Sequence, residues 1–149
     1  MKNKDLHNIV IWFDDDTPVE KDYFDCLNKN AKEMSYDVFV PIIYGQNGII
    51  YSPSEVGLFK GKYIKSPKQK IPKEKFNAIN SCLAVRLRAY QTYRYDEGLF
   101  MDCVDTKLFD DFRQKNMNFC VLPVEIHQNF FQRGEDKNVQ RYWNRFRIR

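Results

Sequence analysis

The sequence predicts an α/β fold. Short apolar runs bounded by turn residues, as at residues 8–13 and 37–44, are typical of buried strands. Between them lie stretches in which apolar residues recur at helical spacing, the first beginning near Val19. Strands that alternate with helices indicate an α/β domain. The length of 149 residues fits a single domain, which we divide into a core at 8–127 and a basic, aromatic tail at 128–149.

Composition narrows the class of protein. A hydrophobic share of 43% with 30% charged residues is sufficient for a core and argues against disorder. No apolar run is long enough to cross a bilayer or to form a secretory signal, so we expect a cytoplasmic protein. The cysteines show neither CxxC spacing nor clustered histidines, which predicts buried thiols without zinc. They are Cys26, Cys82, Cys103 and Cys120.

The first apolar run, residues 8–13, predicts a strand buried on both faces of a mostly parallel sheet. It ends in the acidic triplet Asp14-Asp15-Asp16, at the sheet edge where α/β proteins bind ligands. A helix start follows, with Thr17 as N-cap, Pro18 at the first helical position and Glu20 completing a capping box. The expected buried face of this helix consists of Val19, Tyr23, Cys26, Leu27 and Ala31.

A second strand is expected over residues 37–44, where Pro41 requires an edge position or a bulge. Residues 45–48 (GQNG) predict a turn, and a short return strand begins at Ile49. Residues 52–75 are rich in lysine, proline, glycine and serine and show no periodicity. They predict a long surface loop, a kind of segment that is often functional.

The remaining elements follow from the same signals. Residues 81–85 predict a strand followed by a short helix, and residues 95–98 predict a turn. A last strand is expected at 118–123 and a last helix at 140–149. Between the turn and that strand, helical spacing joins Val104, Leu108, Phe109 and Phe112.

The acidic triplet is the first candidate site. Carboxylates this close together repel, and a hard cation such as Mg²⁺ offsets their charge while also binding substrate phosphates. The alternative is an acidic loop that helps to cap the next helix. The triplet alone does not decide between them.

Asp102 and Asp105 form a second acidic site near the predicted helix start. One of them is a candidate general base, and the alternative is helix N-capping. His127 follows a strand and is a candidate metal ligand, proton acceptor or structural hydrogen-bonding group.

Taken in chain order, these segments resemble family 2 glycosyltransferases, in particular the bacterial rhamnosyltransferase-like group. The most specific match is residues 95–109 (YDEGLFMDCVDTKLF), which is similar to the family's F-D-E-x-L-F-I-D-x-V-D stretch. The other matching segments are 8–23 (NIVIWFDDDTPVEKDY), 38–52, 80–86 (NSCLAVR), 116–127 and 141–145 (RYWNR).

The resemblance implies a partial GT-A (Rossmann-like) fold, a mixed sheet with flanking helices. It also implies sugar transfer from a nucleoside-diphosphate donor to a glycan or lipid-linked acceptor, usually with inversion and with Mg²⁺ or Mn²⁺. Asp14 and Asp16 would be the D-x-D pair that binds metal, with Asp14 and Asp15 toward the nucleotide. Asp105 matches the family's base position, with Asp102 beside it. His127 stands in the family's closing motif and is assigned to the metal.

Two positions depart from the family pattern. Cys82 stands where the family usually has glycine, and Asp111 stands where it usually has arginine. The family's first β-α-β portion, which holds the nucleobase, has no counterpart before Asn8. We therefore expect an upstream-encoded N-terminal half as a partner. The alternative function is a non-catalytic remnant or partner subunit of a split enzyme.

The basic tail suggests peripheral contact with the inner face of an anionic membrane. Its arginines lie in no recognisable nucleic-acid-binding module, so we expect no nucleic-acid partner.

Overall fold

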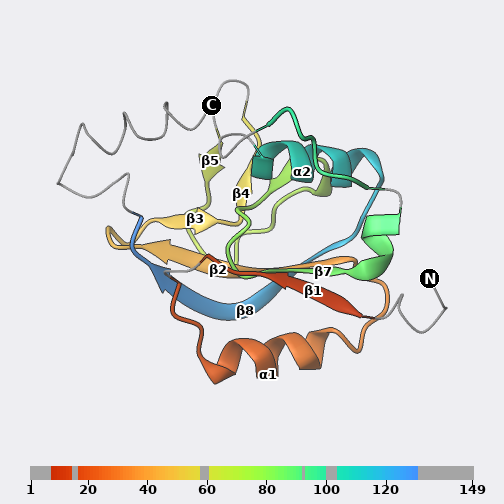
Figure 1. The fold of residues 1–149 in the computed structure, drawn as a ribbon. Coiled ribbons are helices and arrows are strands. Elements are labelled where there is room, and N and C mark those ends of the chain that lie inside the picture. Colours follow the sequence, from red (N-terminus) through yellow and green to blue (C-terminus); the bar gives the residue numbers. More distant parts are fainter. Residues whose placement is uncertain (1–7, 15–16, 58–60, 92, 100–103, 131–149) are drawn as a thin grey trace.

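The computed structural model describes residues 8–14, 17–57, 61–91, 93–99 and 104–130. In this part of the chain, two α-helices lie on opposite sides of a five-stranded sheet (Figure 1). The helices are α1 (Lys21–Asn30) and α2 (Val104–Gln114). The strands of the main sheet are β1 (Ile9–Trp12), β2 (Val38–Gly45), β3 (Ile50–Ser52), β7 (Leu83–Arg86) and β8 (Phe119–Gln128). These helices and strands confirm the general α/β class.

The main sheet is mixed. Its order is β1-β7-β2-β3, and β8 pairs with β2. The pairing of β2 with β8 is parallel, whereas β1–β7, β7–β2 and β2–β3 are antiparallel. The expectation of a mostly parallel sheet was therefore wrong. So was the burial of the first strand, because β1 pairs only with β7 in the described part of the chain and is partly exposed.

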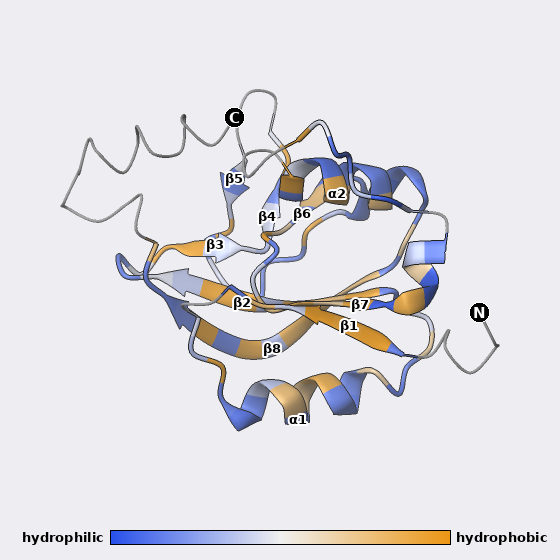
Figure 2. Ribbon diagram, in the orientation of Figure 1, coloured by the Kyte–Doolittle hydropathy of each residue, from blue (hydrophilic) through white to orange (hydrophobic). Residues whose placement is uncertain are grey.

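Apolar residues make up much of the strands of this sheet (Figure 2), and buried side chains pack on both of its faces. On one face, Tyr23 and Leu27 of α1 pack with sheet residues that include Phe39 and Leu122. The whole α1 face expected from helical spacing lies in this cluster. On the other face, Leu108, Phe109 and Phe112 of α2 pack with residues that include Val38, Val40, Leu83 and Val85. Cys82 and Cys120 are buried thiols, as expected, whereas Cys26 is only partly buried. Cys103 lies outside the described residues.

The start of α1 differs from the expected capping box. The helix begins at Lys21 with Glu20 as its N-cap, and Glu20 makes no side-chain capping bond. The Thr17 hydroxyl instead lies 3.1 Å from the Ser81 hydroxyl, next to the beginning of β7. A tertiary hydrogen bond thus replaces the local one, and Thr17 connects the end of β1 to the neighbouring strand.

Two prolines coincide with an irregularity between β2 and β8. The register of this parallel pair shifts between Val40 and Ile42, which face Val121 and Glu125. Pro41 lies in this interval on β2, and Pro123 lies in it on β8. Pro41 therefore lies at an irregularity of the pairing, opposite three residues of β8, where its missing N–H is tolerated. Because pairing resumes after this irregularity, β8 continues beyond Pro123, its expected end, and ends at Gln128, five residues later.

The segment expected to be a long loop contributes to a second, three-stranded sheet, in the order β5-β4-β6. Its strands are short antiparallel pieces, β4 (Ser54–Glu55), β5 (Lys62–Tyr63) and β6 (Phe76–Asn77). A 3₁₀ helix, Lys73–Lys75, precedes β6, and another, Leu87–Gln91, is the short helix expected after β7. Two-residue strands lack a periodic signal, which is why composition alone indicated a loop. The expected helix at 140–149 and the basic tail lie outside the described residues beyond Phe130.

The turn between β2 and β3 offers a test of this packing. A Cβ added at Gly45 would overlap the buried ring of Tyr51, which packs edge-to-face on Tyr63 and Phe130. We expect Gly45→Ala to lower the free energy of unfolding by about 1–3 kcal/mol, as overpacking does. Urea denaturation measures this, with Gly61→Ala as control, because a Cβ there comes no closer than 3.7 Å to a neighbouring atom. Equal stability of the two variants would contradict the packing at Gly45.

Candidate functional site

Polar side chains from distant parts of the chain meet at one edge of the main sheet. β1, β2 and β8 point the same way, because β7 is antiparallel to both β1 and β2 and β8 is parallel to β2. Their carboxyl ends therefore share the edge at which β7 begins. Asp14 follows β1, Gln128 ends β8 and Ser81 lies just before β7. Asp105, in the first turn of α2, completes the group.

Asp14 is held by a residue that sequence analysis did not select. Gln128 Nε2 donates a hydrogen bond of 3.0 Å to Asp14 Oδ2, across 114 positions of sequence. The Asp14 side chain is exposed, whereas Gln128 is only 5% exposed. The signal for Gln128 was the alternation of buried residues along β8, which continues from Cys120 through Leu122 and Ile126 to Gln128.

Asp105 has an unusual acidity for a carboxyl group. Burial raises its pKa to about 6, a hydrogen bond from the backbone of Asn80 opposes this shift, and the charge of Asp14 adds to it. A carboxylate with a pKa near the working pH is suited to accept a proton and later release it. The charge of Asp14 acts on Asp105, so the two carboxylates lie within electrostatic range of each other.

Two amide oxygens at this edge have no hydrogen-bond partner. Asn80 Oδ1 and Gln128 Oε1 are buried and unpaired within the described residues. A buried acceptor without a donor costs roughly 1–3 kcal/mol, so such atoms mark a place for a ligand. A hydroxyl group or a hard cation would satisfy them, and Asp14 with the Gln128 amide oxygen is an all-oxygen set of the kind that Mg²⁺ prefers.

The predicted metal site depends on further acidic residues besides Asp14. Asp15, Asp16 and Asp102 lie outside the described residues. Among the residues that are described, no three His, Cys, Asp or Glu side chains are close enough together to hold a metal ion. The assignment of a metal to Asp14 and Asp16 therefore stays a prediction.

His127 is exposed on the other face of β8. Its ring stacks on Tyr44 of β2, with ring centroids 5.3 Å apart and an interplanar angle of 17°. Side chains alternate along a strand, so Gln128 and His127 point to opposite faces. The structure brings Gln128 to Asp14 and gives His127 a stacking contact. Its predicted role as a metal ligand stays untested.

An aromatic wall, consisting of Trp12, Tyr90 and Tyr95, lies beside Asp105. Trp12 Nε1 donates to the Tyr90 hydroxyl at 2.8 Å, and the rings of Trp12 and Tyr95 pack edge-to-face at 5.7 Å. Burial and the hydrogen bond with Tyr90 raise the pKa of Tyr95, and the charge of Asp105 contributes to the same shift. Trp12 remains 37% exposed. The wall joins β1 to the segment before α2, and no local spacing in the sequence indicated it.

The sequence matches no family model, and neither a curated protein nor a solved structure is significantly similar to it. Neither helix of the described part has the length and apolar character needed to cross a membrane. The interpretation of the site therefore depends on its own chemistry.

Proposed function

We propose that this chain supplies the metal and acceptor part of a glycosyltransferase that uses a nucleoside-diphosphate sugar. The observation that carries the proposal is Asp105, a partly buried carboxyl group whose pKa is raised to about 6 and on which the charge of Asp14 acts. Transfer of a sugar to a hydroxyl group requires a base for the hydroxyl proton and neutralisation of the departing diphosphate. The two acidic positions fit these two tasks.

In the proposed mechanism, Asp105 accepts the proton of the acceptor hydroxyl as its oxygen attacks the anomeric carbon of the donor. The bond from that carbon to the diphosphate breaks on the opposite side, so the configuration inverts. Asp14 and the Gln128 amide oxygen would hold a divalent cation, which when bound stabilises negative charge on the diphosphate oxygens. The aromatic wall beside Asp105 offers apolar surface to the acceptor sugar, and its Tyr90 and Tyr95 hydroxyls add hydrogen-bonding groups.

The backbone at Cys82 supports the family resemblance. Cys82 has a φ of 52°, in the left-handed region that favours glycine. This is the position at which the resembling family usually has glycine. Cys82 is fully buried and its carbonyl accepts a hydrogen bond of 2.9 Å from the Tyr23 hydroxyl. A backbone conformation that favours glycine thus occurs at the position where the family usually has glycine, which is consistent with the resemblance.

The proposal is tested by ligand-dependent melting of the full chain. We expect Mn²⁺ together with UDP or dTDP to raise the melting temperature of the wild type, because a ligand at 100 times its dissociation constant adds about 2.7 kcal/mol. Asp14→Asn, which keeps the shape of the side chain but removes its charge, should abolish most of that rise. Asp22→Asn, an exposed carboxylate on α1, is the matched control. A full rise in Asp14→Asn would count against the proposal.

One observation favours the alternative, a binding subunit that depends on an upstream-encoded half. In the described residues β1 pairs on one side only, with β7, and its apolar sequence contains neither lysine nor proline to block further pairing. A strand from a partner would extend the sheet there. Transfer that appears only on co-expression with such a partner would identify this alternative.

A further inference from the structure

Positive charge is concentrated in the lysine-rich loop, residues 61–75, which runs from β5 to the start of β6. It contains six lysines and one glutamate, so this segment alone holds more net positive charge than the entire chain, whose net charge is +4. Like charges placed this densely repel one another. A stable arrangement of this kind favours the binding of an anion, which would offset the repulsion.

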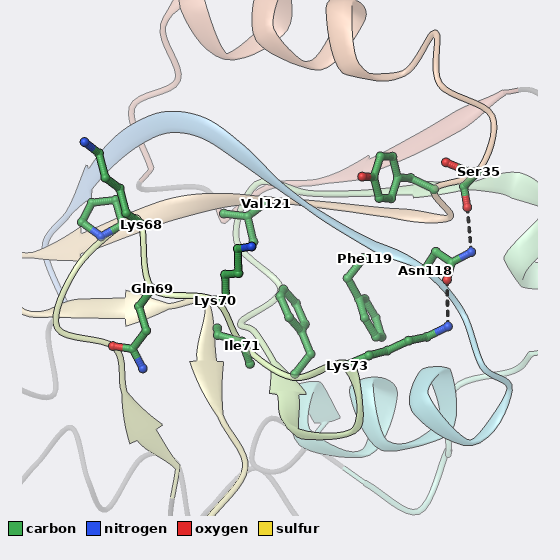
Figure 3. A pocket seen from close by; sticks show the side chains of 12 residues that line it. Ser35, Lys68, Gln69, Lys70, Ile71, Lys73, Asn118, Phe119 and Val121 are labelled. Atoms are coloured by element: carbon green, nitrogen blue, oxygen red, sulfur yellow. Dashed lines mark hydrogen bonds between the residues drawn. The ribbon is translucent and has the colours of Figure 1, made fainter.

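The lysine-rich loop covers a pocket of about 720 Å³ against the start of β8 (Figure 3). The volume lies in the range usual for small-molecule sites, about 300–1,000 Å³. Phe76 and Phe119 line it as a stacked pair, with ring centroids 4.6 Å apart and an interplanar angle of 5°. Ile71 and Val121 add apolar surface. The pocket therefore combines an apolar lining with a strongly basic rim.

The pocket is separate from the Asp14–Asp105 site. Ser35, Tyr36 and Asn118, which line it, precede β2 and β8 and so mark the amino ends of these strands. Asp14 and Gln128 lie at the carboxyl ends. The two sites thus lie at opposite ends of the strands of the sheet, and a ligand at one leaves the other free.

The lysines on the rim have different roles. Lys73 Nζ donates hydrogen bonds of 2.7 Å to Asn116 O and to Asn118 Oδ1, which fixes the loop to the chain entering β8. Lys68 and Lys70 are exposed, and no carboxylate of the described residues forms an ion pair with either. Figure 3 shows the Lys70 side chain extending across the pocket toward Val121. These two ammonium groups are available to a ligand.

We propose that this pocket binds a phosphate-bearing ligand, with Lys68 and Lys70 on the phosphate and an apolar part of the ligand against Phe76 and Phe119. Lysine is a common phosphate-binding residue because its ammonium group acts as a compact point charge with three donors. The apolar lining selects phosphates that are attached to a carbon skeleton. Soluble phosphate esters and the head groups of anionic lipids both present this chemistry.

The first test measures binding of inorganic phosphate, pyrophosphate and phenyl phosphate to the full chain by calorimetry. We expect phenyl phosphate to bind the wild type more tightly than inorganic phosphate, because its ring is buried against the apolar lining. In Lys68→Gln/Lys70→Gln the affinity for pyrophosphate should fall about tenfold or more, because both ammonium groups that would contact the phosphate are removed.

The matched control is Lys62→Gln/Lys65→Gln, which removes the same charge from the same loop at exposed positions outside the pocket. Its affinity should stay within about twofold of the wild type, because neither Lys62 nor Lys65 lines the pocket. If both double variants lost the same affinity for pyrophosphate, the proposal would be overturned, and the lysine-rich loop would attract anions only through its overall positive charge. Unchanged affinity in Lys68→Gln/Lys70→Gln would overturn it as well.

A second test identifies the source of the phosphate. Vesicles with phosphatidylglycerol in phosphatidylcholine are mixed with the chain, and bound protein is separated by flotation. Binding that pyrophosphate displaces indicates a lipid head group, whereas pyrophosphate binding without vesicle binding indicates a soluble ester. Absence of binding to every one of these probes would refute the proposal. Because Asp14→Asn leaves this pocket intact, failure here is independent of the proposed transfer activity.

Discussion

Asp105→Asn is expected to lower kcat/KM for sugar transfer by about 10²–10⁴-fold, the usual contribution of a general base. The amide has the shape of the carboxyl group and can still accept the hydrogen bond from the Asn80 backbone, but it cannot take a proton. The wild-type kcat/KM should rise with pH through about 6, because the carboxylate form is the active one. Radiolabelled transfer assays across pH 5–8, with the N-terminal half present if it is needed, measure both effects.

The same substitution should make the fold more stable at neutral pH. The Asp105 pKa is raised from 3.8 to about 6 in the folded chain, so the folded state binds more protons than the unfolded state between these values. Wild-type stability therefore falls as pH rises from about 4 to 6, by up to about 2–3 kcal/mol. Asp105→Asn removes this loss, so its advantage is absent below pH 4 and complete above pH 6.

Glu97→Gln provides the control, because it neutralises an exposed carboxylate in the turn that precedes the segment leading to α2. Its stability should follow the wild type at every pH. If Asp105→Asn is stabilised while transfer is unaffected, the burial of Asp105 is right and its catalytic role is wrong. If neither property changes, the position of Asp105 at the site is itself in error.

Arg86→Met is expected to cause the largest loss of stability, about 3 kcal/mol or more, because it removes a buried guanidinium group that donates three hydrogen bonds to backbone carbonyl groups. Arg86 is 1% exposed and lies over the ring of Phe39. Its guanidinium group donates to the carbonyl oxygens of Tyr36 at 2.7 Å, Ala31 at 2.6 Å and Glu33 at 3.1 Å. These bonds fix the connection between α1 and β2 to the end of β7, where Arg86 lies.

Urea denaturation measures the effect, and two comparisons sharpen it. Arg86→Lys should recover little, since an ammonium group cannot span three carbonyls as a planar guanidinium group does. Arg88→Met is the comparison for a less buried arginine of the same connection. Arg88 forms an ion pair with Asp37 at 2.7 Å and donates to the carbonyl oxygens of Met34 and Tyr36, so a smaller loss of about 1–2 kcal/mol is expected. A cost below 1 kcal/mol for Arg86→Met would show that this group of bonds is unimportant.

Local patterns in the sequence were sufficient for much of the secondary structure. The apolar faces of α1 and α2, the turn at residues 45–48 and the bulge required by Pro41 all follow from residues a few positions apart. The placement of Asp105 in the first turn of α2 also follows from helical spacing. Such features are predictable because helix and turn preferences act over about one turn of chain.

Long-range contacts decided the candidate site. Thr17 resembles an N-cap in sequence but bonds Ser81, and His127 was selected although the neighbouring Gln128 is the residue that reaches Asp14. Arg86, which matched only as part of a motif, proves to be a buried structural group. Asp14, Gln128 and Asp105 share one end of the sheet only because β7 pairs with β1 and β2 and because β8 pairs with β2. The pKa of Asp105 is raised mainly by its own burial, and the charge of Asp14 adds to that shift. Residue order therefore determined which groups are present and on which elements, while strand pairing and desolvation determined which of them meet and how acidic they become.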